Sequence, residues 1–343
     1  MKNVWYHNHI KIIANQSQKK VHRLLTESTL PPGGLGLIQN LAVRLTGMAG
    51  EQEPDLHPAK IVLFAADHGM VIHGVEAVSC HTSVAQIRSI LAKEAPIAIL
   101  ADHLHVELQV IDVGLTENIE KLNGLLDRRI QNGSTDFLQA PAMTHEQLSL
   151  AMQLGEEAVR QAVENGVRLF IPGEIGVGGS TAAGAMVSIL LGVAPELVAG
   201  PSKGLDEKGM VRKAQVIQKG IDRHLPFNNI PLEALRCLGG LDLAAMTGAF
   251  IACGQRGIPA LVDGFVACTA ALVAITLHPS LKEWLIFAHR SGEPGQRFIL
   301  QTLDVQPILQ LDLRLGEGFG ALSCLPLLRI SCELARKMLR NKQ

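Results

Sequence analysis

The stretch from Val167 to Met186 most constrains what this chain can fold into. It opens with an apolar run that ends at Pro172, passes through the glycine-rich segment Gly173 to Gly179, and closes on small residues typical of a helix start. A strand, a glycine loop and a helix in this order favour an α/β sheet. They also place backbone N–H groups and a helix N-terminus where an anion can bind. We expect Ser180 or Thr181 to cap that helix.

The same loop has a plainer explanation, because glycines also occur wherever a backbone must simply turn tightly. It is not a Walker loop, since no lysine follows Gly179. It nearly fits the dinucleotide pattern G-x-G-x-x-G, but Thr181 stands where the third glycine belongs. Glu174 lies inside this otherwise anion-seeking segment. Its carboxylate must either repel a phosphate or serve chemistry beside one.

Short apolar runs recur along the chain, and helical patterns separate them. The runs cover residues 60–66, 107–111, 167–171, 196–199, 258–262 and 284–288. The helical patterns cover residues 37–46, 83–90, 144–165, 207–224 and 238–254, and a buried helix is expected over 264–277. Such alternation predicts a parallel sheet with helices on both faces.

Polar residues follow most of these runs, at the edge where parallel strands end. They are Asp67, His68, Asp112, Glu174, Asp263, His289 and Arg290. Asp residues in such places often only cap the following helix. Seven polar residues at strand ends are more than helix capping requires, so we predict a site along this edge.

Glu317 lies between two glycines ahead of an apolar helix. An acid in the first turn of a helix can simply favour the helix dipole. The functional alternative is a carboxylate exposed on a tight turn, where the small neighbours let a flat substrate approach closely.

Composition excludes several classes of function. Among 343 residues, 47% are hydrophobic, enough for one large domain or two modest ones, and the net charge of −1 gives no basic excess for nucleic acid or an anionic membrane. The N-terminus lacks a signal-like apolar core, and the longest apolar run falls short of the ~20 residues that span a bilayer. The six cysteines are scattered without a C-x-x-C pair, which predicts a cytoplasmic setting and no metal site.

Taken together, these stretches resemble nicotinate-nucleotide:dimethylbenzimidazole phosphoribosyltransferases, which activate the lower ligand of cobalamin. The matching pieces occur in family order over about residues 27 to 335. They are Pro31 to Gly36, Ala66 to Gly69 with Gly74-Val75, Val110 to Gly114, Gly173 to Gly178, Leu238 to Gly240 with Ala244 to Met246, Val262 to Phe265, Ala288 to Ser291 with Glu293 to Gly295, and Arg314 to Gly318.

The resemblance implies a Rossmann-like parallel sheet with a small helical lobe built from both termini. We expect one transferase unit over residues 1–343, with a large α/β domain at about 58–300 and a lobe from about 1–50 and 305–343. It also implies a cytoplasmic homodimer without cofactor. Such an enzyme moves phosphoribose from nicotinate mononucleotide to a benzimidazole nitrogen, releasing nicotinate and leaving α-ribazole 5′-phosphate.

The resemblance also implies residue roles. Glu317 matches the family's general base, and Glu174 matches its other site acid, which we interpret as facing the ribose. The implied phosphate and ribose contacts are Gly176, Gly178, Ser180, Thr181, Ser202, Lys203 and Lys213; the implied azole contacts are Gln86, Leu315 and Gly316; and further candidates at the site edge are Asp67, His68, Asp263, His289, Arg290 and Ser291. Lys213 is equally interpreted as an ordinary exposed helix lysine.

Several positions depart from the family pattern. Gly179 replaces an Asn, Pro201 removes a backbone donor from the second glycine loop while Lys203 adds a cation, and Leu30 replaces a lysine. The azole segment 79–87 retains Gln86 but little else. The acceptor therefore stays open among a benzimidazole, a purine such as adenine, and a phenol.

Two other functions compete with transfer. One is a diverged paralogue that binds a nucleotide or azole without turnover, against which the retention of both Glu174 and Glu317 argues. The other is an NAD-dependent dehydrogenase, which needs an acid at the end of the strand after the glycine loop. Glu196 begins the next apolar run rather than ending it, so this alternative ranks last.

Overall fold

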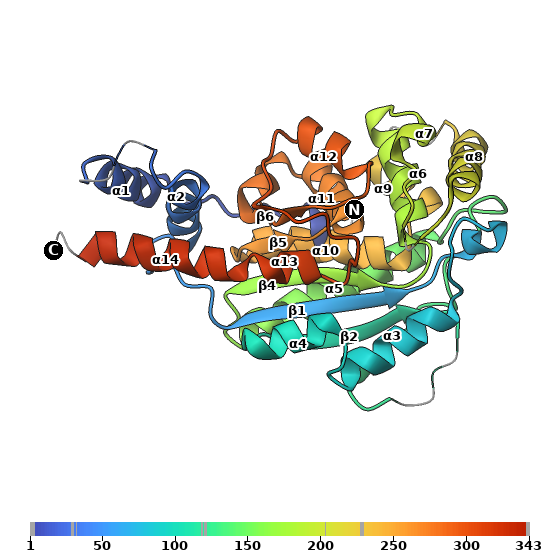
Figure 1. The fold of residues 1–343 in the computed structure, drawn as a ribbon, viewed down its shortest axis with the longest axis horizontal. Coiled ribbons are helices and arrows are strands. Elements are labelled where there is room, and N and C mark those ends of the chain that lie inside the picture. Colours follow the sequence, from blue (N-terminus) through green and yellow to red (C-terminus); the bar gives the residue numbers. More distant parts are fainter. Residues whose placement is uncertain are drawn as a thin grey trace.

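The computed structural model describes residues 4–28, 31, 33–117, 119, 122–202, 204–226 and 230–340. Its centre is a six-stranded parallel sheet in the order β3-β2-β1-β4-β5-β6 (Figure 1). The strands are β1 (Ala59–Ala66), β2 (Glu107–Gly114), β3 (Leu125–Asp127), β4 (Leu169–Ile175), β5 (Ala260–Val262) and β6 (Leu285–Phe287). This confirms the predicted parallel, Rossmann-like α/β sheet, and its strand order changes direction between β1 and β4, where such sheets bind ligands.

Strand β1 lies at the middle of the sheet, and every one of its residues is buried. Its Phe64 pairs in register with Ile111 of β2 and with Glu174 of β4. The strands therefore end together, which brings the residues after β1 beside Glu174 and the glycine loop.

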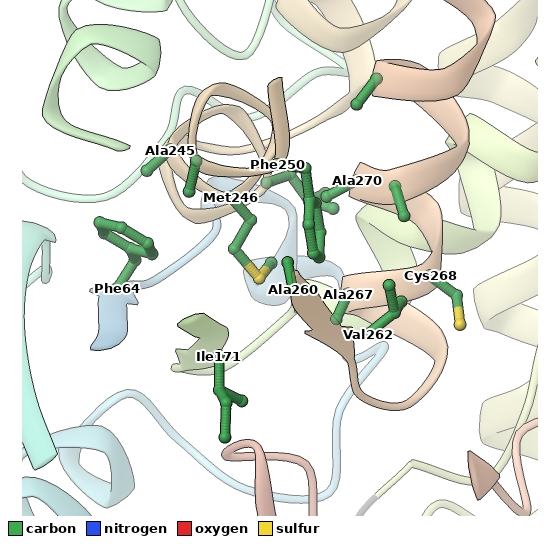
Figure 2. Packing of buried hydrophobic residues seen from close by; sticks show 14 of the residues in the cluster. Phe64, Ile171, Ala245, Met246, Phe250, Ala260, Val262, Ala267, Cys268 and Ala270 are labelled. Atoms are coloured by element: carbon green, nitrogen blue, oxygen red, sulfur yellow. The ribbon is translucent and has the colours of Figure 1, made fainter. Parts of the chain in front are cut away.

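Helices cover both faces of the sheet. On one face, α10 (Leu241–Arg256) packs against β1, β2, β4 and α5 (His145–Glu164), and α11 (Phe265–Leu277) packs beside it. Figure 2 shows Met246 and Phe250 of α10 on this side of the strands, whereas Ile171 points the other way. Glycine allows the close contact between α5 and α10, because a Cβ at Gly155 would lie 1.9 Å from the carbonyl oxygen of Ala245.

On the opposite face, the turn before α13 (Phe319–Ser323) lies over Ile61 and Ile171. Helix α4 (Pro96–His103) packs between β2 and α13, and α3 (His81–Leu91) contacts α4. A group of helices continues from the end of β4: α6 (Gly179–Leu191), α7 (Pro195–Val198), α8 (Glu207–His224) and α9 (Pro231–Leu238), with α12 (Gln296–Thr302) packed against α6 (Figure 1).

One predicted element was wrong, and another begins later than expected. Residues 196–199 were expected to form a strand, but Pro195 to Val198 form the short helix α7, which Pro195 starts at a position where a missing N–H costs nothing. The helix expected over 238–254 is α10, which begins only at Leu241 because the backbone is not helical at Gly239 and Gly240.

The helical lobe joins both ends of the chain. Helices α1 (Asn15–Thr26), α2 (Leu37–Ala49) and α14 (Leu325–Arg340) pack together around Val21, Leu25, Ala42 and Ala335 (Figure 1). Arg44 ties this lobe to the sheet, since its Nη2 donates hydrogen bonds to the carbonyl oxygens of Lys282 at 2.6 Å and Leu285 at 2.7 Å. The domain boundaries themselves stay a prediction.

The remaining elements are short: η1 (Trp5–His7), η2 (Gly69–His73), η4 (Pro279–Trp284), and a two-stranded sheet of β7 (His289–Arg290) and β8 (Leu309–Gln310). All six cysteines are free thiols and five are buried, in line with their interpretation as small apolar core residues. None of the helices in the described ranges combines the length and apolar character that crossing a membrane requires.

Candidate active site

A cleft opens at the carboxyl ends of β4 and β5. Its wall comes from three regions far apart in the sequence: the end of β4 with the glycine loop, the start of α11, and the turn before α13. Predicted residues that line it are Glu174, Gly176, Gly178, Ser180, Ser202, Asp263, His289, Ser291, Leu315, Gly316 and Glu317. The structure thus brings most of the predicted site together.

The loop needs glycine because its backbone packs directly on the end of β1. A Cβ at Gly176 would lie 1.7 Å from the carbonyl oxygen of Ala66. Gly178 has φ +102° and is itself the N-cap of α6, without a side-chain cap. The expectation that Ser180 or Thr181 caps this helix was therefore wrong, because both hydroxyls lie inside the helix and donate to Oε1 of Glu76, at 3.2 and 3.0 Å.

Lys213 of α8 is a buried cation at one end of the cleft. Its side chain is 1% exposed, which excludes the interpretation as an ordinary surface lysine. Its Nζ donates to Ser180 Oγ at 2.8 Å and to Ser202 Oγ at 2.5 Å, and it lies 3.5 Å from Glu76 Oε1. This cluster, together with the loop, has the donors that an anion needs. Lys203 lies outside the described residues.

Glu174 and Glu317 approach each other at the other end. A Cβ at Gly316 would lie 2.9 Å from Glu174 Oε1, so the turn that carries Glu317 touches the Glu174 carboxylate. Glu317 has φ +61° and is 4% exposed. Its Oε1 accepts a hydrogen bond from Gln86 Nε2 of α3 at 3.2 Å. Gln86 thus reaches the site through Glu317 and is not among the residues lining the cleft.

Asp263 fixes the turn after Glu317. At the end of β5, its Oδ1 accepts the backbone N–H of Ala321 at 2.7 Å and its Oδ2 accepts that of Gly318 at 3.2 Å. The buried ring of His289 brings Nε2 within 3.3 Å of Asp263 Oδ1. Arg290, by contrast, is exposed and does not line the cleft, so it was wrong as a candidate for this wall.

Asp67 has a structural role instead of a place in the cleft wall. Its Oδ1 accepts from Ser83 Oγ at 2.5 Å and from the N–H of Val177 at 3.1 Å, and its Oδ2 accepts the N–H of Thr116 at 3.0 Å. Asp67 thereby joins the loops that follow β1, β2 and β4. Asp112 is similarly occupied by Arg129 and by backbone N–H groups.

His68 lies behind the glycine loop. Its Nε2 is 3.2 Å from Asp242 Oδ2, both side chains are fully buried, and the ring fits between Gly178 and Gly240. Burial acts to lower the pKa of His68, but the carboxylates of Asp242, Asp67 and Glu174 outweigh it, so the pKa is raised. In its protonated form the ring adds positive potential near Glu174.

Sequence analysis missed three acids of this site: Glu76, Glu293 and Asp242. Glu76 and Glu293 line the cleft beside Lys213, whereas Asp242 acts through His68. Glu76 follows a matched pair, Gly74-Val75, and Glu293 begins a matched triplet, so the matched pieces contained a usable signal. Within the ranges that the structure describes, we find no group of three or more His, Cys, Asp or Glu side chains placed to hold a metal ion.

Comparison with known proteins decides the family. Residues 10–343 match the family model described as phosphoribosyltransferase and designated DBI_PRT. The chain belongs to this family. Relatives in it include nicotinate-nucleotide–dimethylbenzimidazole phosphoribosyltransferases of Pseudomonas putida, 39% identical over 98% of this chain and 96% of that protein, and of Pseudomonas aeruginosa, 40% identical over 96% and 94%.

A solved structure agrees with this assignment. The phosphoribosyltransferase of the same name from Thermus thermophilus superposes with a TM-score of 0.89 at 34% identity, covering 94% of this chain and 96% of that one. The phosphoribosyltransferase family is therefore shown by sequence and by fold, and the chain is a pentosyltransferase.

Proposed function

We propose that this protein transfers phosphoribose from nicotinate mononucleotide to 5,6-dimethylbenzimidazole or a related base, giving nicotinate and α-ribazole 5′-phosphate. The observation that carries the proposal is one cleft with two kinds of group. Glu174 and Glu317 line it together with Ser180 and Ser202, whose hydroxyls bind the buried Lys213. Transfer of a ribose phosphate between two flat rings needs both the acids and the cationic group.

The chemistry needs one general base and no general acid. Nicotinate leaves from a cationic pyridinium as a neutral ring nitrogen, so its departure takes no proton. The azole attacks the ribose carbon through one nitrogen, and its other nitrogen loses a proton. We assign that proton to Glu317, which is nearly buried and held by Gln86. Glu174 faces the ribose and stabilises the positive charge that develops there.

The phosphate lies at the cationic end in this proposal. Ser180, Ser202 and Lys213 meet it, with backbone N–H groups of the loop from Gly176 to Gly178. Lys213→Met removes the charge at similar volume. We expect it to raise the KM for nicotinate mononucleotide more than 10-fold, since a charged hydrogen bond contributes about 1.5–3 kcal/mol.

The acceptor, assembly and location are part of the proposal. Dimethylbenzimidazole is favoured because it appears in the names of the relatives, while adenine and phenols remain candidate acceptors. We further propose a homodimer, as the resemblance implies, and a cytoplasmic location, which the free thiols favour. The alternative of a non-catalytic paralogue is less favoured, because Glu174 and Glu317 line the same cleft.

One experiment tests the activity. The purified protein is incubated with nicotinate mononucleotide and a panel of dimethylbenzimidazole, benzimidazole, adenine and phenol, and released nicotinate is measured by chromatography. We expect release that depends on an acceptor. Absence of release with every acceptor would refute the transferase proposal, and the fastest acceptor identifies the natural class.

A further inference from the structure

Two carboxylates flank the buried ammonium at the phosphate end of the cleft. Glu76 Oε1 lies 3.5 Å from Lys213 Nζ. Glu293 lines the same cleft, and its Oε1 accepts the backbone N–H of Ser202 at 3.1 Å. The Ser202 hydroxyl in turn binds Lys213 Nζ. With both acids ionised, these three side chains carry a net charge of −1 before a phosphate binds, which opposes the entry of a dianion.

The two carboxylates are not equivalent. Glu76 accepts hydrogen bonds from Ser180 and Thr181 and faces Lys213, so its charge is well compensated. Glu293 Oε2 is buried and meets no hydrogen-bond donor among the described residues. This oxygen is packed against Gly200, where an added Cβ would lie 2.1 Å from it. A buried, unpaired carboxylate oxygen is costly, whereas a protonated one is neutral and can donate.

The surroundings of Glu293 favour its protonated form. Burial raises the pKa of its carboxyl, and the Glu76 carboxylate raises it further. Lys213, the N–H of Ser202 and Arg314 act in the opposite direction without cancelling the increase. A phosphate that enters beside Lys213 adds negative charge and increases the preference for the proton.

We propose that the cleft takes the donor phosphate together with one proton from solvent, which Glu293 carries on its buried Oε2. The inference rests on the proposed function, because it takes the phosphate to lie against Ser180, Ser202 and Lys213. Protonation removes one of the two negative charges beside the phosphate. Glu293 thus assists phosphate binding by becoming neutral.

Calorimetry tests this directly. Nicotinate mononucleotide is titrated into the protein in buffers of different ionisation enthalpy, at several values from about pH 6 to about pH 9. The dependence of the observed enthalpy on the buffer gives the protons taken up. At pH values where Glu293 is ionised in the free protein and protonated in the complex, we expect uptake of about one proton per site. In that range the Kd should rise about 10-fold per pH unit.

Glu293→Gln is the decisive variant. Its amide oxygen keeps the hydrogen bond from the N–H of Ser202, and its NH2 group stands where the unpaired oxygen was. We expect this variant to lose the uptake attributed to Glu293 and, at the highest pH, to bind the nucleotide more tightly than the wild type. Damage to the fold does not produce a gain in affinity.

Glu76→Gln is the matched control. It changes the charge of the pocket equally, but the Glu76 carboxylate is already paired, so we expect uptake to persist. Because the Glu76 charge raises the pKa of Glu293, the uptake should move to lower pH in this variant. Binding without uptake in the wild type overturns the inference and leaves the transferase intact if nicotinate is still released. Uptake that persists in Glu293→Gln places the proton on the phosphate itself and also overturns it. Failure to bind either nicotinate mononucleotide or ribose 5-phosphate overturns both proposals.

Discussion

Gly173 packs against the backbone of Glu317. A Cβ at Gly173 would lie 3.4 Å from the carbonyl carbon of Glu317 and 3.3 Å from the nitrogen of Gly318. Glu174 is the next residue of β4, so this backbone contact sets the spacing of the two acids. The pair is therefore positioned by main chain on main chain, which is more rigid than contact between long side chains.

Removing the base should slow the reaction strongly. Glu317→Gln keeps the volume and an oxygen that can accept from Gln86, but it cannot take the azole proton. We expect nicotinate release to fall about 10²–10⁴-fold, the usual contribution of a positioned base. Gln86→Leu, which removes only the hydrogen bond to Glu317, should cost less. Activity near the wild-type level in Glu317→Gln removes Glu317 from this role.

Asp263 is expected to act by holding the turn of Glu317. Asp263→Asn replaces one acceptor oxygen by NH2, so the N–H of Gly318 or Ala321 loses its partner. We expect unfolding free energy to fall by about 1–3 kcal/mol and kcat to fall while the KM for the nucleotide stays constant. Denaturant titration and steady-state kinetics measure both.

Asp112→Asn is a matched control for that variant. Asp112 also lies near the carboxyl end of a strand and accepts two backbone N–H groups, but it is not among the residues lining the cleft. We expect it to lower stability with little change in kcat per folded molecule. An equal fall in kcat for both variants contradicts a specific role for Asp263.

The two ends of the glycine loop should respond differently to alanine. At Gly176 a Cβ would meet the carbonyl oxygen of Ala66 at 1.7 Å, so we expect Gly176→Ala to displace the loop and abolish activity. At Gly179 the nearest atom, Asp242 Oδ2, is 3.6 Å away, an ordinary contact. Gly179→Ala should therefore fold and retain turnover. Nicotinate release and thermal unfolding distinguish these outcomes.

The stability of the free protein should depend on pH through Glu293. Because burial raises the pKa of this carboxyl in the folded state, the folded protein binds the proton more tightly than the unfolded chain. Its contribution is therefore full below the ordinary carboxyl pKa of about 4.3 and is lost as the pH rises through the raised value. We expect the Tm of Glu293→Gln to increase relative to that of the wild type as the pH rises. A constant difference between the two Tm values rules this out.

Much of the fold followed from short-range pattern. The helix expected over 207–224 coincides with α8, and five of the six apolar runs are strands. The exception, residues 196–199, shows the limit: four apolar or small residues fit a helix turn as well as a strand, and Pro195 decided between them. The ring of His68 lies against Gly240 just before α10, a contact from another part of the chain that local pattern does not predict.

The site was predictable where strands bring residues to one edge, as for Glu174 and Asp263. What sequence did not provide is which polar groups satisfy one another. Asp67 follows a strand as Asp263 does, yet its carboxylate already accepts hydrogen bonds from Ser83, Thr116 and Val177. Lys213 lies on the buried face of α8, four residues before Ile217, but the helix pattern does not reveal that Ser180 and Ser202 bind its ammonium group.

The left-handed backbone at Glu317, with φ +61°, sets catalysis against folding at one position. A residue with a Cβ costs roughly 1–2 kcal/mol in this conformation, and glycine avoids that cost. Glu317→Gly should therefore give an inactive protein that resists heat as well as the wild type or better. A lineage that no longer needed the reaction would lose this acid without penalty to its fold.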